Sequence, residues 1–377
     1  MRVVLTGGGT GGHIYPALAI AEQLKADKPD TEFLYIGGKR GLENSIVPTA
    51  GLPFETLDIT GFRRSLSADN LKTVLRFLRG VQASSELLEK FKPDVVVGTG
   101  GYVCGPVVYA AHKLRIPTLI HEQNAIPGLT NRFLSRYVNT VAVSFDGTQD
   151  QFPKARRVMY SGNPRATTVH RADSAEGFRL LGLPAGTPIV LVVGGSIGAK
   201  AVNEAMLEMV PEIGRMPRVH YVYVTGKRYY EDAKRSLDEA PGGTPANLHV
   251  LPYVDRMPEV LAASMLVVSR AGASFLAEVT SLGIPAVLIP SPNVTNNHQE
   301  VNARALEEEG AAIVILEREL NGSRLFSAVE AVVSDDYLRE NMSACSSALG
   351  KPDSAKTIVT ELRKLAVRAQ AIRRGVL

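Results

Sequence analysis

The sequence predicts an α/β protein with two doubly wound domains, each built on a parallel sheet that helices cover on both faces. Short apolar runs alternate with helical stretches along the chain, and this alternation is typical of parallel sheets. A glycine-rich loop directly follows an apolar run twice, at residues 7–12 and at residues 194–198. The chain of 377 residues is also long enough for two domains.

The first domain is predicted at residues 1–163. Its strands are expected at the apolar runs 3–6, 33–36, 94–98, 117–120, 139–143 and 157–160. A stretch rich in proline, glycine and charge follows, and residues 164–353 then repeat the pattern as a second domain. The strands of that domain are expected at 189–193, 220–224, 248–251, 265–269 and 286–289. Residues 354–377 are predicted to form a helix that packs back on the first domain.

The loop Thr6–His13 joins the first predicted strand to a helix. Its glycines let the backbone approach an anion without Cβ clashes, and the N-terminus of the following helix attracts negative charge. The pattern therefore predicts a phosphate site. His13 lies at the end of the loop, where its side chain can reach the bound ligand.

The same loop also fits a dinucleotide-binding fold, because Gly7, Gly9 and Gly12 satisfy the pattern G-x-G-x-x-G. Such folds place an acidic residue at the end of the second strand, about 20 residues further on, to bind a ribose. Residues 37–40 end that strand here with two glycines and two basic residues instead. The basic residues suit a 2′-phosphate, so NADP binding stays open as the weaker alternative.

Two further polar loops follow strands of the first domain, at Gly98–Gly105 and His121–Gly128. Ligands of parallel sheets bind beyond the carboxyl ends of the strands, so we expect both loops to meet the first glycine loop at one cleft. His121 is equally compatible with a buried core histidine. Glu122 is also compatible with a residue that only orients its neighbours.

The second domain repeats the strand and glycine loop at residues 189–199. Ser274 is a candidate N-cap of a later helix, and Glu278 lies about one turn further along. The Glu278 carboxylate can face a cleft or serve as an ordinary capping group. The loop 291–299 is dense in amides and hydroxyls, which suit sugar recognition and are also common in loops.

Composition excludes several function classes. The net charge of +4 is too mild to indicate nucleic-acid binding. Cys104 and Cys345 lie far apart and form no metal or redox motif, which favours a reducing cytoplasm. No apolar run reaches the ~18 residues that span a membrane, and the N-terminus begins a strand without signal-peptide features.

Two α/β domains that offer phosphate-binding loops suit a glycosyltransferase with a nucleotide-sugar donor. No D-x-D motif occurs in the sequence, so it predicts no dedicated metal site for the diphosphate. Backbone N–H groups, helix ends and a cation such as Arg165 are then expected to stabilise the leaving diphosphate.

Five motifs resemble the MurG family of glycosyltransferases in peptidoglycan synthesis. They are Gly7–His13, Gly98–Tyr102, His121–Asn124, Gly194–Ser196 and Arg270–Glu278. The resemblance runs from the first strand to beyond residue 299. It implies a bacterial enzyme without a cofactor and a GT-B fold, in which two Rossmann-like domains face a cleft.

The implied reaction moves N-acetylglucosamine, with inversion, from its UDP donor to O4 of N-acetylmuramic acid in lipid I, which gives lipid II. Residues 1–163 would bind the acceptor and associate with the membrane, and residues 164–353 would bind the UDP-sugar. The resemblance further implies a peripheral protein at the cytoplasmic face of the bacterial cell membrane. Its expected partners are the two substrates and an anionic membrane surface, and no nucleic acid.

Carried over by motif, the resemblance makes His13 the candidate base and Glu122 the alternative. Glu278 is similar to the carboxylate that holds the ribose hydroxyls, and the backbone of Val254 to the group that meets the uracil. The implied donor-binding residues are Thr10, Gly11, Gly12, Asn124, Arg165, Ser196, Val254, Ala273, Ser274, Phe275, Leu276, Glu278 and Gln299. The implied acceptor-binding residues are Gly98, Thr99, Gly100, Gly101 and Tyr102.

The chain departs from the family in two places. Some members carry Gln-Gln where this chain has His298-Gln299, so the role of His298 stays open. Some also have a residue between Pro164 and Arg165. Three alternatives remain: a macrolide or lipid glycosyltransferase, an epimerase of UDP-N-acetylglucosamine, and a non-catalytic nucleotide-sugar sensor.

Residues 71–81 combine apolar and basic side chains in a predicted helix. The apolar positions at helical spacing are Leu71, Val74, Leu75, Phe77, Leu78 and Val81. A surface helix with snorkelling cations is the simpler interpretation. A lipid substrate favours the alternative, an interfacial patch in which Leu75, Phe77 and Leu78 enter the membrane while Arg76 and Arg79 meet anionic headgroups.

Overall fold

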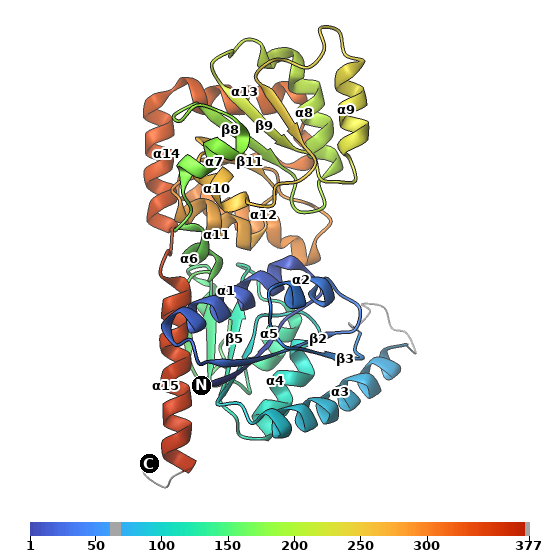
Figure 1. Ribbon diagram of the computed structural model, residues 1–377, viewed down its shortest axis with the longest axis vertical. Helices are drawn as coiled ribbons and strands as arrows, with labels where there is room; N and C mark the ends of the chain where they lie inside the picture. The colour runs from blue at the N-terminus through green and yellow to red at the C-terminus, as the bar shows by residue number, and fades with distance from the viewer. Residues whose placement is uncertain (61–68, 374–377) are drawn as a thin grey trace. The chain divides into compact units, whose positions relative to one another are not determined.

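The computed structural model describes residues 1–60 and 69–373 (Figure 1). The chain divides into two compact units. Unit 1 comprises Met1–Thr167 and Pro352–Leu377, and unit 2 comprises Thr168–Lys351. Each unit contains one sheet whose paired strands are all parallel. The predicted α/β class with two doubly wound, Rossmann-like units is therefore confirmed.

Unit 1 alternates strands and helices. Its strands are β1 (Arg2–Thr6), β2 (Glu32–Gly38), β3 (Phe54–Leu57), β4 (Val95–Gly98), β5 (Thr118–Glu122), β6 (Thr140–Val143) and β7 (Val158–Tyr160). Its helices are α1 (Gly11–Asp27), α2 (Glu43–Thr49), α3 (Asp69–Phe91), α4 (Cys104–Lys113), α5 (Leu129–Leu134) and α15 (Ser354–Arg373), and α6 (Arg165–Val169) leads into unit 2.

Unit 2 repeats this alternation. Its strands are β8 (Ile189–Val193), β9 (His220–Val224), β10 (Leu248–Leu251), β11 (Leu266–Ser269), β12 (Ala286–Leu288) and β13 (Ala312–Val314). Its helices are α7 (Ser174–Leu181), α8 (Lys200–Ile213), α9 (Tyr230–Asp238), α10 (Met257–Ala262), α11 (Ala273–Ser281), α12 (His298–Glu308), α13 (Gly322–Ser334) and α14 (Asp336–Leu349).

The order of the strands places the glycine loops. The sheet of unit 1 has the order β3-β2-β1-β4-β5-β6-β7, and the sheet of unit 2 has the order β10-β9-β8-β11-β12-β13. In each sheet the chain winds outward in opposite directions from two central neighbours, β1 and β4 or β8 and β11. Ligands of doubly wound sheets bind where this reversal occurs, beyond the carboxyl ends of the strands. A ligand site is therefore expected at the loops that follow these four strands.

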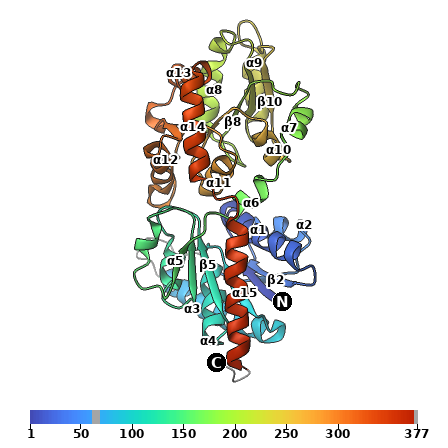
Figure 2. The same cartoon turned by 90° about the vertical axis from the view of Figure 1, so that its left-hand side faces the viewer.

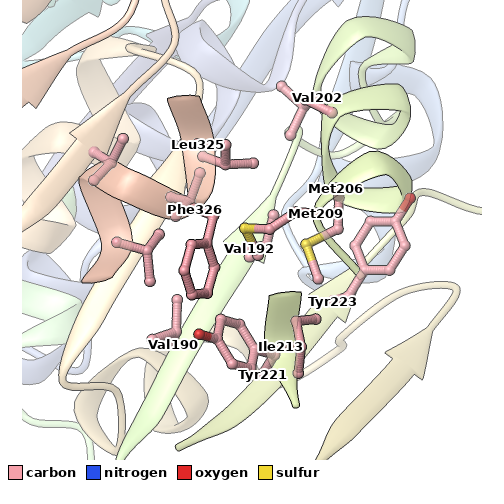
Figure 3. Packing of buried hydrophobic residues seen from close by; sticks show 14 of the residues in the cluster. Val190, Val192, Val202, Met206, Met209, Ile213, Tyr221, Tyr223, Leu325 and Phe326 are labelled. Atoms are coloured by element: carbon pink, nitrogen blue, oxygen red, sulfur yellow. The ribbon is translucent and has the colours of Figure 1, made fainter. Parts of the chain in front are cut away.

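The central strands are buried on both faces. In β1, Val3 and Leu5 pack with α1 and α15, whereas Val4 packs with α3 and α4 on the opposite face of the sheet. Figures 1 and 2 show α15 running alongside unit 1. In unit 2, alternate residues of β8 and β9 pack on one face of the sheet against α8 and α13, where Phe326 of α13 lies against Val190 (Figure 3). Burial on both faces explains the continuous apolar runs of the sequence.

The sequence prediction missed β3 and β13. Both strands lie at the edge of their sheet, where a strand is covered less than a central one. Their segments are short, and β3 alternates half-buried and exposed residues rather than forming an apolar run. Among the described residues, none of the helices combines the length and the apolar composition that crossing a bilayer requires.

Helix α3 carries apolar side chains of two kinds. Val74, Leu75 and Leu78 are 41%, 50% and 58% exposed. Phe77 instead packs against the core, with its ring centroid 6.2 Å from those of Tyr109 and Phe133. This corrects the expectation that Phe77 enters a membrane, because its ring already has partners inside unit 1. The side chain of Leu71, also assigned to this patch, lies outside the described residues.

Candidate active site

The loops after β1 and β4 interlock. Gly8 N–H donates to Gly100 O at 3.3 Å, and the buried Thr99 hydroxyl donates to His13 O at 2.7 Å. Gly101 has a φ of +82° and packs so closely on Gly8 that an added Cβ would overlap the Gly8 carbonyl oxygen. Glycine is therefore required at position 101, where the two loops are in direct contact.

His13 lies in the first turn of α1, at this edge. Its Nδ1 is 2.9 Å from Gly8 O, and a carbonyl oxygen can only accept a hydrogen bond. We therefore assign the proton of the neutral imidazole to Nδ1, which leaves the lone pair on Nε2. An added Cβ at Gly100 would lie 3.0 Å from Nε2, so glycine there gives the ring its space. With this tautomer, Nε2 of His13 can accept a proton, as a general base must.

Glu122 is buried, and both of its carboxylate oxygens hold the loop after β5. Oε1 accepts from Asn124 N at 3.0 Å and from Asn124 Nδ2 at 3.3 Å. Oε2 accepts from Gly128 N at 3.0 Å and from Asn131 Nδ2 at 2.9 Å. These four N–H donors occupy the acceptor positions of the carboxylate, so its geometry favours a role in shaping the loop over that of a base.

His121 is wholly buried beside Glu122 and is a core histidine. Its Nε2 lies 3.0 Å from Gly162 O, and the Gln123 side-chain amide lies 3.0 Å from its Nδ1. Burial lowers the pKa of His121 from its ordinary value near 6.5 to about 4. The residue is therefore neutral in the folded protein at pH 7.

We expect this burial to make the folded protein acid-sensitive. Between pH 6.5 and pH 4 the unfolded chain binds a proton at His121 and the folded chain does not, so the free energy of unfolding falls as pH decreases. Within that window the contribution is up to ~1.4 kcal/mol per pH unit. Urea denaturation of the wild type should show a steeper loss than His121→Gln, which cannot titrate. Equal slopes for the two proteins would contradict the assignment.

The other predicted residues of unit 1 surround the same loops. Thr10, Gly11 and Gly12 begin α1, and Asn124 follows β5. The Tyr102 hydroxyl donates to Arg40 O at 3.3 Å. The Arg165 guanidinium lies over the Tyr15 ring at 5.4 Å from its centroid, which places a cation beside the start of α1.

Unit 2 presents its predicted residues at the equivalent strand ends. Ser196 is exposed in the loop after β8, between Gly195 and Gly198 with φ of +99° and +77°. Val254 follows β10 and is half-buried. Glycines at positive φ let this loop present backbone groups to a ligand.

The N-terminus of α11 is the second predicted anion site of unit 2. Its N-cap is Gly272, which has no side chain with which to satisfy the first N–H groups. The main chain of Ala273, Ser274, Phe275 and Leu276 therefore forms the positive end of a nine-residue helix. Glu278 lies further along this helix and is 7% exposed.

Gln299 lies in the first turn of α12, and part of its side chain already makes a hydrogen bond. Its Oε1 accepts from Ser291 N at 2.9 Å, so its NH₂ group is the part that can donate to a sugar hydroxyl. His298 directs Nδ1 to Thr295 O at 2.8 Å. This contact ties His298 to its own loop.

Sequence reasoning missed Glu43. This carboxylate is wholly buried and accepts from Gly9 N and Gly38 N, each at 3.0 Å. A carboxylate therefore does reach the end of β2, contrary to the prediction, but it is occupied by the backbone. The available signal was the cluster of glycines at 37, 38 and 41, which makes room for the side chain.

Metal ligands are not clustered in the described part of the chain. No group of three or more His, Cys, Asp or Glu side chains there is arranged to hold a metal ion.

Comparisons with known proteins agree across the whole chain. Residues 3–143 match the glycosyltransferase family 28 N-terminal domain, and residues 189–358 match the C-terminal domain of that family. A Bacillus licheniformis protein named UDP-N-acetylglucosamine--N-acetylmuramyl-(pentapeptide) pyrophosphoryl-undecaprenol N-acetylglucosamine transferase is 51% identical over 97% of this chain and 99% of its own length.

Solved structures show the same architecture. MurG from Acinetobacter baumannii is similar with a TM-score of 0.76 and 29% identity, over 96% of this chain and 99% of that one. A UDP-N-acetylglucosamine 2-epimerase from Neisseria meningitidis has a TM-score of 0.67 with 15% identity, over 97% of this chain and 100% of that one. At that identity the similarity to the epimerase shows a common fold and nothing more. Together with the match to MurG, it confirms the predicted GT-B fold.

Proposed function

The chain belongs to glycosyltransferase family 28, and on that premise we propose that it transfers N-acetylglucosamine from UDP-N-acetylglucosamine to O4 of N-acetylmuramic acid in lipid I. It is an N-acetylglucosaminyltransferase of peptidoglycan synthesis, and its product is lipid II. The match to the Bacillus relative covers nearly the full length of both chains, and the name of that relative supports this donor and this acceptor.

One observation carries the mechanism: His13 Nδ1 lies 2.9 Å from Gly8 O at the β1–β4 edge. With the proton assigned to Nδ1, Nε2 is the basic nitrogen. Nε2 takes the proton of the acceptor hydroxyl as its oxygen attacks C1 of the sugar. The bond from C1 to the UDP oxygen breaks on the opposite face. An α-linked donor therefore gives a β-linked product, with inversion.

The leaving diphosphate is stabilised without a metal ion in this proposal. Unit 2 supplies the first turn of α11 and the loop around Ser196 for this purpose. Backbone N–H groups at helix N-termini are fixed before the reaction, so they need no reorganisation as negative charge develops. Activity that survives a chelator and is not raised by added Mg²⁺ supports this part.

The remaining donor contacts are assigned by motif. Glu278 accepts from the ribose hydroxyls, the backbone of Val254 meets the uracil, and the Gln299 NH₂ group donates to the sugar. The loop Gly98–Tyr102 is assigned to the acceptor. Its contacts with the glycine loop, through Thr99 and Gly100, keep it beside His13.

We assign the exposed face of α3 to the membrane surface. Val74, Leu75 and Leu78 are exposed, and Arg76 and Arg79 are interleaved with them. An acceptor with an undecaprenyl chain is available only at a bilayer, and basic residues beside apolar ones suit anionic headgroups. We further propose that the protein is peripheral and acts at the cytoplasmic face of the bacterial cell membrane.

Leu75→Asp combined with Leu78→Asp should reduce sedimentation with anionic vesicles while activity on a water-soluble acceptor is retained. Each change removes buried apolar area and adds repulsion from anionic lipid. Tyr337→Asp with Val367→Asp is the control, because those side chains are 83% and 65% exposed and the charge change is the same. Equal vesicle binding by both double variants would remove α3 from the membrane surface.

Turnover of UDP-N-acetylglucosamine with and without a lipid I analogue tests the function itself. A transferase releases UDP and forms a disaccharide lipid only when the acceptor is present. An epimerase converts the donor sugar without an acceptor, and a nucleotide-sugar sensor binds the donor without turnover. The last two outcomes would contradict the proposal.

A further inference from the structure

Glu43 is a wholly buried carboxylate that the mechanism above does not use. It begins α2, and each of its oxygens accepts one backbone hydrogen bond: Oε2 from Gly9 N and Oε1 from Gly38 N, both at 3.0 Å. Both partners are donors, so the carboxyl group serves them as an acceptor, which suits the ionised form. Its place is directly behind the first glycine loop.

The surrounding glycines show that the chain is shaped around this carboxylate. An added Cβ at Gly8 or Gly41 would overlap the carboxylate oxygens, and one at Gly37 would lie 2.8 Å from Glu43 Cγ. Burying a charge costs free energy unless polar partners compensate it. The carboxylate also acts electrostatically on Tyr102. The pKa of Tyr102 is raised mainly by burial and further by the charge of Glu43.

Glu43 accepts a hydrogen bond from Gly9 N–H, and this N–H group belongs to the same peptide unit whose carbonyl contacts His13. Gly9 N–H and Gly8 C=O are the two ends of one peptide group, and Gly8 O is 2.9 Å from His13 Nδ1. Chains of hydrogen bonds polarise one another, so a carboxylate at the N–H end makes the carbonyl end a stronger acceptor. The hydrogen bonds thus link the Glu43 carboxylate to the Gly8–Gly9 peptide and this peptide to the His13 imidazole.

We propose that Glu43 is a positioning residue for His13 and acts through the Gly8–Gly9 peptide. It fixes the orientation of that peptide, holds the His13 proton on Nδ1, and stabilises the positive charge that forms when Nε2 takes the acceptor proton. A directly bonded carboxylate does this for the histidine of hydrolase triads. The inference rests on the proposed role of His13 as base.

Glu43→Gln is the first test. The side chain keeps its size, but its NH₂ group would face a backbone N–H, donor against donor. We expect kcat to fall roughly 10- to 100-fold, a part of the 10²–10⁴-fold that a general base contributes, with little change in KM for UDP-N-acetylglucosamine. Glu361→Gln is the matched control, since Glu361 is a buried carboxylate on α15 that accepts from Thr140 Oγ1 at 2.9 Å, and it should keep the wild-type kcat.

A double-mutant cycle separates positioning from mere structural support. In the His13→Ala background, Glu43→Gln should cause no further loss of kcat, because residues that act as one unit are not additive. A structural role would lower kcat by the same factor with or without the imidazole. Additive losses would therefore overturn the proposal.

The ¹⁵N NMR spectrum of His13 tests the proposal without turnover. The neutral imidazole of the wild type should carry its proton on Nδ1, and Glu43→Gln should shift the population toward Nε2–H. A wild-type proton on Nε2, or an unchanged tautomer in Glu43→Gln, would overturn the proposal. If Glu43→Gln does not fold, Glu43→Asp gives the same readout, because its shorter side chain cannot reach both N–H groups.

The tautomer measurement also separates this inference from the proposed function. A wild-type protein that forms no lipid II would contradict the transferase assignment. The spectrum of His13 would still decide whether Glu43 controls the imidazole, because it needs neither substrate.

Discussion

His13→Ala is expected to lower kcat by about 10²–10⁴-fold while the affinity for UDP stays near that of the wild type. The imidazole Nδ1 is held by Gly8 O, so Nε2 is the nitrogen that can take a proton from the acceptor. Alanine removes that proton acceptor and leaves the main chain of α1 in place. Steady-state kinetics with a lipid I analogue measure kcat, and calorimetry measures UDP binding.

His220→Ala is a suitable control for this experiment. His220 begins β9 in unit 2, and its ring stacks on His249. It lies at the amino end of this strand, whereas the glycine loop of unit 2 follows the carboxyl end of β8. This variant should keep the wild-type kcat. If His13→Ala kept kcat and raised only the KM for the acceptor, His13 would be a binding residue. Glu122 would not replace it easily, because four N–H donors already occupy its oxygens.

The pattern of apolar runs predicted the fold well where strands are buried on both faces. Such strands leave a continuous apolar run, as in β4 and β8, whose residues are buried throughout. The edge strand β3 was missed because its four residues include the exposed Glu55 and form no apolar run. The edge strand β13 was missed although residues 311–316 are all apolar, and only three of these residues form the strand. The sequence therefore identifies the centre of each sheet better than its edges.

The candidate site was predictable where function depends on a local motif. The glycine loop and His13 are contiguous in the chain, so their relation was visible in the sequence. Glu43 was not, because its partner Gly9 lies 34 positions away and only the packed structure brings them together. Phe77 failed for a related reason: helical spacing placed it on an apolar arc but could not show that Tyr109 and Phe133 cover it.

Glu278→Ala is expected to weaken UDP binding by a factor of ten or more. Glu278 is 7% exposed on α11, the helix whose N-terminus is assigned to the diphosphate. A carboxylate that accepts from two ribose hydroxyls makes charge-assisted hydrogen bonds, each worth ~1.5–3 kcal/mol. Losing even one such bond corresponds to about a tenfold change in Kd.

Comparing UDP with 2′-deoxy-UDP shows whether the loss occurs at the ribose. The wild type should bind 2′-deoxy-UDP more weakly, because one hydroxyl partner of Glu278 is missing. Glu278→Ala should bind the two ligands with nearly equal affinity, since the group that distinguishes them is gone. Unchanged UDP affinity in a folded Glu278→Ala protein, or undiminished discrimination against the deoxy ligand, would place Glu278 away from the ribose and leave it as a buried carboxylate of α11.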